Sequence, residues 1–187
     1  MKKNPEVTAI TRKNFIEAYC QLSQKIPLEK ITVRAVTECA GYNRSTFYQY
    51  FDDINDVVTA IESEVLAHVL VKVDDNLLRG QLTLGFIEAF SHLHAELSNY
   101  YQVVFLPTVN SSFTNKLKTA VMEKVIEAYH LPATDVKVQY IIEFNLSGVI
   151  SVIYRWLGDS KKISTNELAA LIRDVINTGL EHQLSIK

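Results

Sequence analysis

The chain has 187 residues, of which 48% are hydrophobic and 21% charged, with only 6 glycines and 4 prolines. This composition excludes a disordered or collagen-like chain and predicts a folded protein of one large or two small domains. No apolar run follows the N-terminus, so we expect no signal peptide and a cytoplasmic protein. The formal net charge of −2 by itself argues against a nucleic-acid binder.

The distribution of charge argues the other way. Residues 1–51 hold eight basic and four acidic side chains, a net charge of +4, whereas residues 52–187 hold 11 basic and 17 acidic ones, a net charge of −6. This split suggests that the basic part, residues 1–51, contacts phosphates and that the acidic part does not. A split of this size is also common by chance, so it points to a function only in combination with a motif.

The two cysteines, Cys20 and Cys39, have neither metal-site spacing nor the density of a disulfide scaffold. Both fall among apolar residues in a helical pattern, so we expect two buried thiols in a reducing compartment. His92 and His94 are two residues apart, and on a helix they point in different directions and make a poor metal pair. We therefore expect no metal site and no cofactor.

Three helices are predicted at the start of the chain. The first covers residues 8–25 and is stopped by Pro27, which follows it. Thr32 can cap a short second helix, which can end at Gly41 because glycine tolerates a positive φ. Asn43 can cap a third helix over residues 44–51, which is too short to persist without tertiary packing.

The third helix is expected to pack through Phe47 and Phe51, which are four residues apart and share a face. Asp53 and Asp56 favour the start of a long helix after it. Further helices are predicted over residues 53–79, 82–97, 99–106, 112–130, 134–157 and 164–183, the last opened by a capping box of Ser164 and Glu167. No period-2 alternation predicts a strand, so we expect an all-α fold.

Residues 32–51 have the layout of a helix-turn-helix, with a short helix, a turn containing glycine, and a helix rich in groups that bond to DNA. Arg44 offers a guanidinium fork to guanine, and Gln49 offers an amide to adenine. Hydroxyl groups suit phosphate oxygens. The alternative is a three-helix cluster with an aromatic core that does not touch DNA.

The run AGYNRSTFYQYF at residues 40–51 resembles the DNA-binding motif of the TetR family of transcriptional regulators, and the resemblance extends over about residues 8–58. It implies base contacts by Arg34, Arg44, Ser45 and Gln49, and phosphate contacts by Thr32, Thr46, Tyr48 and Tyr50. The family commonly has a phosphate-binding lysine where this chain has Ile54, preceded by Asp52 and Asp53. This departure lowers the expected affinity for DNA.

The predicted domains are a helix-turn-helix DNA-binding domain over residues 1–52 and a helical domain for ligand binding and dimerisation over residues 53–187. Residues 148–157 loosely resemble the subgroup that includes the activator of dihydroxyacetone kinase operons. The resemblance implies a regulator that responds to a small-molecule effector and binds double-stranded DNA at a near-palindromic operator as a homodimer. Repression is the commoner action in the family.

The helix over residues 134–157 is apolar on nearly all sides, so a second face is expected to be buried by a partner. We expect it to form a four-helix dimer interface with the last helix and their symmetry copies. The interface candidates are Ile142, Leu146, Val149, Ile150, Ile153, Trp156, Leu168, Leu171, Ile172, Val175 and Ile176. Polar residues interrupt the helix and its length is marginal for a bilayer, so we expect no membrane span.

An effector pocket is predicted among the helices of residues 82–130, where aromatic side chains with a few polar groups suit a partly apolar small molecule. The candidates are Phe86, Phe90, His94, Tyr101, Phe105, Phe113 and Met122. The alternative is that these residues only fill the core.

Two other classes of function compete with a DNA-binding regulator. An enzyme is disfavoured, because the sequence contains no glycine-rich phosphate loop, nucleophile elbow, HExxH or CxxC motif. A helical co-regulator that acts through protein contacts with little DNA affinity stays open, and Asp52, Asp53 and Ile54 motivate it.

Overall fold

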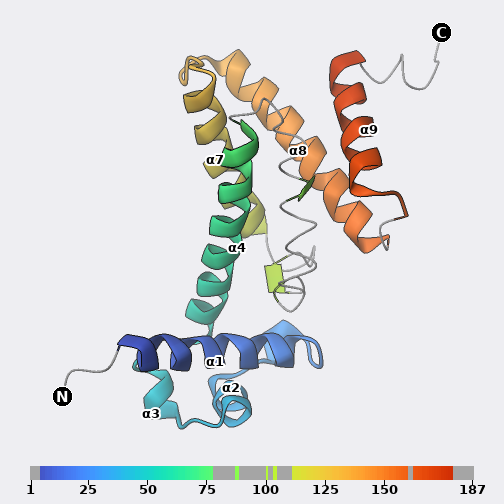
Figure 1. The fold of residues 1–187 in the computed structure, drawn as a ribbon. Coiled ribbons are helices and arrows are strands. Elements are labelled where there is room, and N and C mark those ends of the chain that lie inside the picture. The colour runs from blue at the N-terminus through green and yellow to red at the C-terminus, as the bar shows by residue number, and fades with distance from the viewer. Residues whose placement is uncertain are drawn as a thin grey trace. The chain divides into compact units, whose positions relative to one another are not determined.

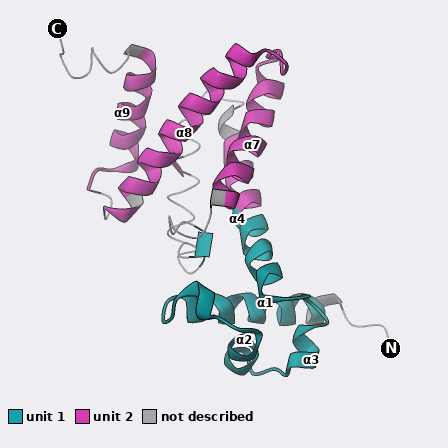
Figure 2. Cartoon of the chain, turned by 180° about the vertical axis from the view of Figure 1, so that it is seen from behind, with its two compact units in different colours: residues 1–65, 97–110 teal, residues 66–96, 111–187 magenta. Residues whose placement is uncertain are grey.

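The computed structural model describes residues 5–77, 87–88, 100, 103–104, 111–159 and 162–178. Within these ranges the chain is helical and contains no strand, which confirms the all-α prediction (Figure 1). Two compact units are present: Met1–Val65 with Leu97–Asn110, and Leu66–Glu96 with Ser111–Lys187 (Figure 2). A piece from the middle of the sequence thus belongs to the unit that holds the N-terminal helices.

The first unit begins with α1 (Pro5–Ser23). This helix starts earlier than predicted, because proline suits a first helical turn, where the amides have no intrahelical acceptor. A single 3-10 turn, η1 (Leu28–Lys30), leads to the buried Ile31 and then to the next helix.

The next two helices are capped as predicted. The Thr32 hydroxyl oxygen accepts the Ala35 amide at 3.2 Å to start α2 (Val33–Ala40), and Gly41 ends it with a φ of 74°. Asn43 Oδ1 accepts the Thr46 amide at 2.8 Å to start α3 (Arg44–Phe47).

The third helix is shorter than the predicted span of residues 44–51. After Phe47 the chain tightens into three-residue turns, in which the Gln49 and Tyr50 amides donate to the carbonyls of Thr46 and Phe47. Such tightening is common where a helix ends. The prediction of two full α-helical turns is therefore wrong.

The core of the first unit is aromatic and centres on Phe15 of α1. Its ring centroid lies 5.1 Å from Tyr42, 5.3 Å from Phe47 and 6.4 Å from Phe51. Phe15 and Phe47 are fully buried and Phe51 nearly so, which confirms the predicted inward direction of both phenylalanines. Tilted and edge-to-face ring pairs of this kind stabilise the cluster beyond the area they bury.

The long helix α4 (Ile54–Leu77) begins where the sequence predicts. Asp53 Oδ1 accepts the amides of Asn55 at 2.6 Å and Asp56 at 3.1 Å. These bonds lower the pKa of Asp53 below its usual value, because they favour the charged carboxylate. Asp53 thus caps the start of α4.

The second unit contains α7 (Ser111–Ala128), α8 (Val136–Gly158) and α9 (Thr165–Thr178). An ion pair between Lys118 and Glu143 joins α7 to α8, and Lys124 Nζ lies 2.6 Å from Asp74 Oδ2 of α4. The predicted helices over residues 82–97 and 99–106 lie almost entirely outside the described residues.

The predicted capping box opens α9. The Ser164 amide donates to Glu167 Oε2 at 2.8 Å, and the Glu167 amide donates to Ser164 Oγ at 3.2 Å. Hydrogen bonds to the Glu167 carboxylate from the Ser164 side chain and from the Ser164 backbone amide lower the pKa of Glu167. Just before α9, the Ile163 carbonyl accepts a hydrogen bond from Trp156 Nε1 of α8 at 2.8 Å.

The prediction of two buried cysteines is confirmed for Cys20 and wrong for Cys39. Cys20 is buried, and burial raises its pKa to about 12. Cys39 is exposed, because α2 buries only Val36 and Thr37 and leaves the residues near its end outside the core.

Candidate nucleic-acid interface

All eight predicted DNA-contact residues lie on or beside α2 and α3, around the aromatic core of the first unit. Six of them are exposed: Thr32, Arg34, Arg44, Ser45, Tyr48 and Gln49. Thr46 and Tyr50 are partly buried. The packing that buries Phe47 therefore leaves donors and acceptors on the opposite surface, where a nucleic acid could reach them.

Arg34 is engaged by a neighbour that the sequence analysis overlooked. Its Nε lies 2.7 Å from Glu38 Oε1, one helical turn further along α2, and both side chains are exposed. The hydrogen bond to Glu38 raises the pKa of Arg34. The spacing of four residues could have revealed this pair. Arg34 must exchange Glu38 for DNA before it can contact a base.

Two of the predicted hydroxyl contacts are engaged within the turn. Asn43 Oδ1 accepts the Ser45 hydroxyl at 2.7 Å and the Thr46 hydroxyl at 2.9 Å, in addition to the Thr46 amide. A phosphate oxygen only accepts hydrogen bonds, so these hydroxyls must leave Asn43 before they donate to DNA. At Thr32 the hydroxyl oxygen is the acceptor, and its hydrogen is not used in the cap.

The two tyrosines of the motif differ in their surroundings. Tyr48 is 56% exposed, and its ring stands edge-on to Phe47 with centroids 5.6 Å apart. Tyr50 is partly buried, with its ring 6.2 Å from Phe15. The core therefore positions Tyr48 without covering it, which suits a phosphate contact better than the setting of Tyr50.

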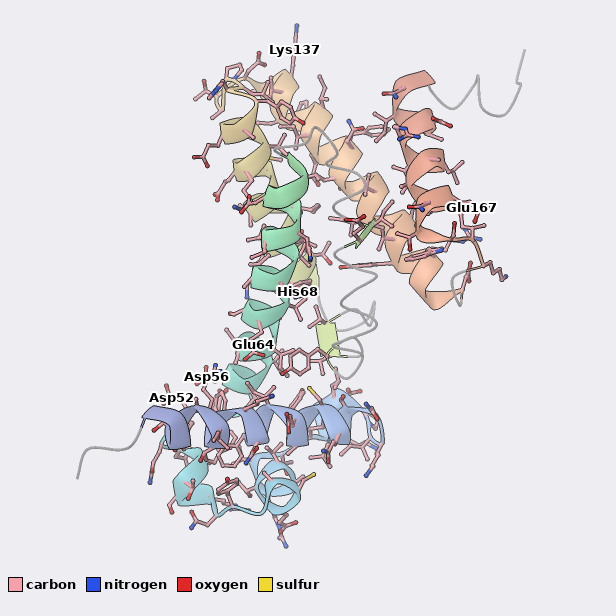
Figure 3. All side chains as sticks on the ribbon, viewed as in Figure 1. Asp52, Asp56, Glu64, His68, Lys137 and Glu167 are labelled. Carbon is pink, nitrogen blue, oxygen red and sulfur yellow. The ribbon has the colours of Figure 1, made fainter. Side chains whose placement is uncertain are left out.

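Acidic residues follow the motif in the chain at the start of α4, where Figure 3 labels Asp52 and Asp56. The Asp52 amide donates to Asp56 Oδ2 at 2.8 Å, so the Asp56 carboxylate serves a local turn. Ile54, at the position where the resembled motif has a lysine, is half-buried. These side chains supply no positive charge for a phosphate.

Two residues of the predicted effector pocket, Phe113 and Met122, belong to the described part of the chain. Phe86, Phe90, His94, Tyr101 and Phe105 lie outside the described residues. Phe113 is fully buried and Met122 half-buried, both on α7. An open hollow of about 630 Å³ runs along another face of α7, and the described side chains that line it are mainly polar: Ser112, Asn115, Lys116, Thr119, Ala120 and Glu123.

The predicted dimer residues are mostly covered by their own chain. The structure buries Ile142, Leu146, Val149, Ile150, Ile153, Trp156, Leu168 and Ile172. Val175 is half-buried, and only Leu171 and Ile176 are exposed. Hydrophobic periodicity could not distinguish a stripe that packs within the chain from one that is left uncovered.

A different stripe of α8 is uncovered. Phe144 is 80% exposed, Tyr140 72% and Ile141 62%, and Val152 is exposed on the same helix. We call these four residues the α8 apolar face. Among the described helices, the segment Val136–Trp156 is long and apolar enough to cross a membrane, a test that core helices also pass. Its Glu143 is paired with Lys118, and its buried stripe packs within the protein.

The architecture is that of an all-helical protein with an N-terminal helix-turn-helix. Residues 81–178 match the family model of a TetR-type "Transcriptional regulator C-terminal region". The chain therefore belongs to the TetR-like transcriptional regulators, which confirms the resemblance found in its N-terminal motif.

Solved structures agree with this assignment at the level of the fold. The chain is similar to the fatty acid degradation regulator FadR from Bacillus halodurans, with a TM-score of 0.70 and 15% identity over 96% of this chain and 98% of that one. It is also similar to the dihydroxyacetone kinase operon activator DhaS, with a TM-score of 0.60 and 19% identity over 93% and 96%. A comparison with curated proteins gives no match.

Proposed function

We propose that this regulator binds a near-palindromic operator in double-stranded DNA as a homodimer and that a small molecule modulates its affinity. The observation that carries the proposal is the exposed polar surface of α2 and α3, held in place by the Phe15 cluster. Residues 1–52 would bind DNA, and residues 53–187 would bind the effector and the second subunit.

The roles proposed at the DNA surface follow from exposure and hydrogen bonding. Arg44 and Gln49 are proposed to read base edges, since both are exposed and carry two-pronged polar groups. Thr32 and Tyr48 are proposed to bind phosphates. The remaining candidates, Arg34, Ser45, Thr46 and Tyr50, would contribute after they leave their present partners or from the edge of the core.

The homodimer is proposed to form through the α8 apolar face, together with the exposed Leu171 and Ile176 of α9. Contiguous exposed apolar side chains mark association surfaces, because burying them removes apolar area from water. A two-fold dimer would present two recognition helices about one DNA turn apart, roughly 34 Å. The predicted interface residues that are buried would support this face from inside.

The direction of regulation is proposed to be repression, the commoner action that the family resemblance implies. The effector is proposed to be a partly apolar small molecule, and the protein to act in the cytoplasm. One structural relative is called a regulator of fatty acid degradation and the other an operon activator.

The proposal is tested by selecting bound fragments from sheared genomic DNA at several salt concentrations and measuring stoichiometry by sizing. We expect a near-palindromic site bound by a dimer, with affinity falling as salt rises because phosphate contacts release counterions. A transcriptional reporter carrying the selected site then tests repression. Recovery of no fragment above background at low salt would contradict DNA binding and favour the co-regulator, in line with Asp52, Asp53 and Ile54.

A further inference from the structure

A single carboxylate on α4 contacts two other parts of the first unit. Glu64 Oε1 lies 3.5 Å from Arg12 Nη1 of α1. The Glu64 carboxylate also accepts a hydrogen bond from the Tyr100 hydroxyl. Figure 3 labels Glu64 on α4. Three segments that are far apart in sequence therefore meet at this side chain.

Arg12 extends this connection to Phe51, the last residue of the segment 44–51, which we call the recognition segment. Its guanidinium carbon lies 5.3 Å from the centroid of the Phe51 ring. Phe51 in turn packs on Phe47 with ring centroids 5.4 Å apart. A cation over an aromatic face is attracted by the ring's negative charge distribution. Arg12 therefore lies against the ring that packs on Phe47 of the helix proposed to read DNA.

Tyr100 belongs to a segment that is assigned to a different unit from the chain on either side of it. Leu97–Asn110 lies in the first unit, although the chain on both sides of it, Leu66–Glu96 and Ser111–Lys187, forms the second unit. Tyr100 is 6% exposed. Burial, followed by the neighbouring Glu64 charge, raises the pKa of Tyr100, so the hydroxyl stays protonated and able to donate.

We infer that Glu64 is a positioning residue that links Tyr100 to Arg12 and thereby supports the recognition segment through Phe51. The Tyr100 hydrogen bond fixes the carboxylate, and the fixed carboxylate holds Arg12 against the ring. A displacement of Tyr100 would reach the DNA surface by this route. The inference rests on the proposed DNA-binding function and specifies how Tyr100 would influence it.

The expected effect is modest, because Arg12 and Glu64 are each about two-fifths exposed and such ion pairs are weak. We expect Tyr100→Phe, which keeps the ring and removes only the hydroxyl, to lower operator affinity about 5-fold, near the lower end of common coupling effects. Glu64→Ala should lower it by a similar factor. The double variant should lose no more than either single variant, because both changes break the same link.

The experiment uses the full-length protein and measures affinity for the selected operator by fluorescence anisotropy, with thermal midpoints recorded in parallel. Tyr154→Phe is the matched control, since its hydroxyl lies 3.2 Å from Thr114 Oγ1 in the second unit. We expect this control to bind the operator as the wild type does. Losses that multiply in the double variant, or an unchanged affinity in Tyr100→Phe, would overturn the link.

A second measurement does not depend on DNA. Amide hydrogen exchange across residues 44–51 should be faster in Tyr100→Phe than in Tyr154→Phe, because the recognition segment loses the support of Arg12. Equal exchange in the two variants would overturn the positioning role. If the wild type binds no DNA while exchange responds as expected, the proposed function fails and the link is retained.

Discussion

The helix-turn-helix and the helices α7 to α9 bury apolar side chains in different ways. In the first unit, Phe15 of α1 forms a common cluster with Phe47 and Phe51 of the helix-turn-helix, and the polar residues of the motif lie outside this cluster. On α8, one apolar stripe is buried and a second, which includes Phe144, is exposed. The helix-turn-helix completes its core with α1, whereas a long helix that is apolar all round needs another surface to cover it.

The largest expected effect is on the aromatic cluster. Phe15→Ala should lower the free energy of unfolding by about 3–5 kcal/mol, because it removes a fully buried ring that packs against four others. Chemical denaturation followed by circular dichroism measures this. Ile10→Ala on the same helix is the control, since Ile10 is exposed and should change stability by no more than about 0.5 kcal/mol. Similar losses in both variants would contradict the assigned core.

A carboxylate introduced into the buried stripe of α8 should lower stability, whereas one introduced into the exposed stripe should prevent dimerisation. Ile150→Asp places a carboxylate in the interior and should destabilise the fold by several kcal/mol, on the order of 3–5. Phe144→Asp should leave the subunit folded and convert the dimer to a monomer, because the exposed ring lies in the proposed interface. Sizing with multi-angle light scattering, together with thermal melts, separates these outcomes. A Phe144→Asp protein that stays dimeric would place the interface elsewhere.

Arg44, proposed to read base edges, and Tyr48, proposed to bind DNA phosphates, should differ in how their loss affects sequence preference. Arg44→Ala should weaken operator binding by about 1–3 kcal/mol and relax sequence preference. Tyr48→Phe should weaken binding to all sequences alike. Competition anisotropy with operator and scrambled duplexes distinguishes the two. Full operator selectivity in Arg44→Ala would disprove its base-reading role.

Glu38 offers a way to test Arg34 without removing it. Glu38→Gln releases the guanidinium, so DNA affinity should rise and its dependence on salt should steepen. Glu17→Gln is a suitable control, because it breaks the exposed Lys13–Glu17 pair of α1 at the same helical spacing. The same anisotropy titrations apply. An equal gain from both variants would indicate a general charge effect and not a specific release of Arg34.

The smallest expected effect concerns the start of α9. Ser164→Ala should lower stability by about 1 kcal/mol, since it removes the acceptor for the Glu167 amide. The pKa of Glu167 is lowered in the fold, so its contribution is present above the usual glutamate pKa and is lost as pH falls through the lowered value. Denaturation midpoints at pH 7 and at pH 3 measure both effects. Stability of Ser164→Ala equal to wild type at pH 7 would contradict the capping box.

The sequence determined the helical fold, the caps and the recognition motif. Thr32, Gly41 and Asn43 act within a few residues of themselves, so their spacing was enough to predict the turns they form. Phe47 and Phe51 were predictable for the same reason, because a four-residue interval places them on one side of the segment. Even here the length of α3 was overestimated, since its last turn tightens where the chain leaves the helix.

Only the tertiary structure decided which apolar residues of α8 are covered, which cysteine is buried, and which charges meet. Arg12, Phe51, Glu64 and Tyr100 are separated by many residues, and no periodicity connects them. Local patterns report interactions within a few turns of a helix. Contacts between distant segments depend on how whole elements pack, and in the first unit such contacts bring Arg12 of α1 to Glu64 of α4 and to the ring of Phe51.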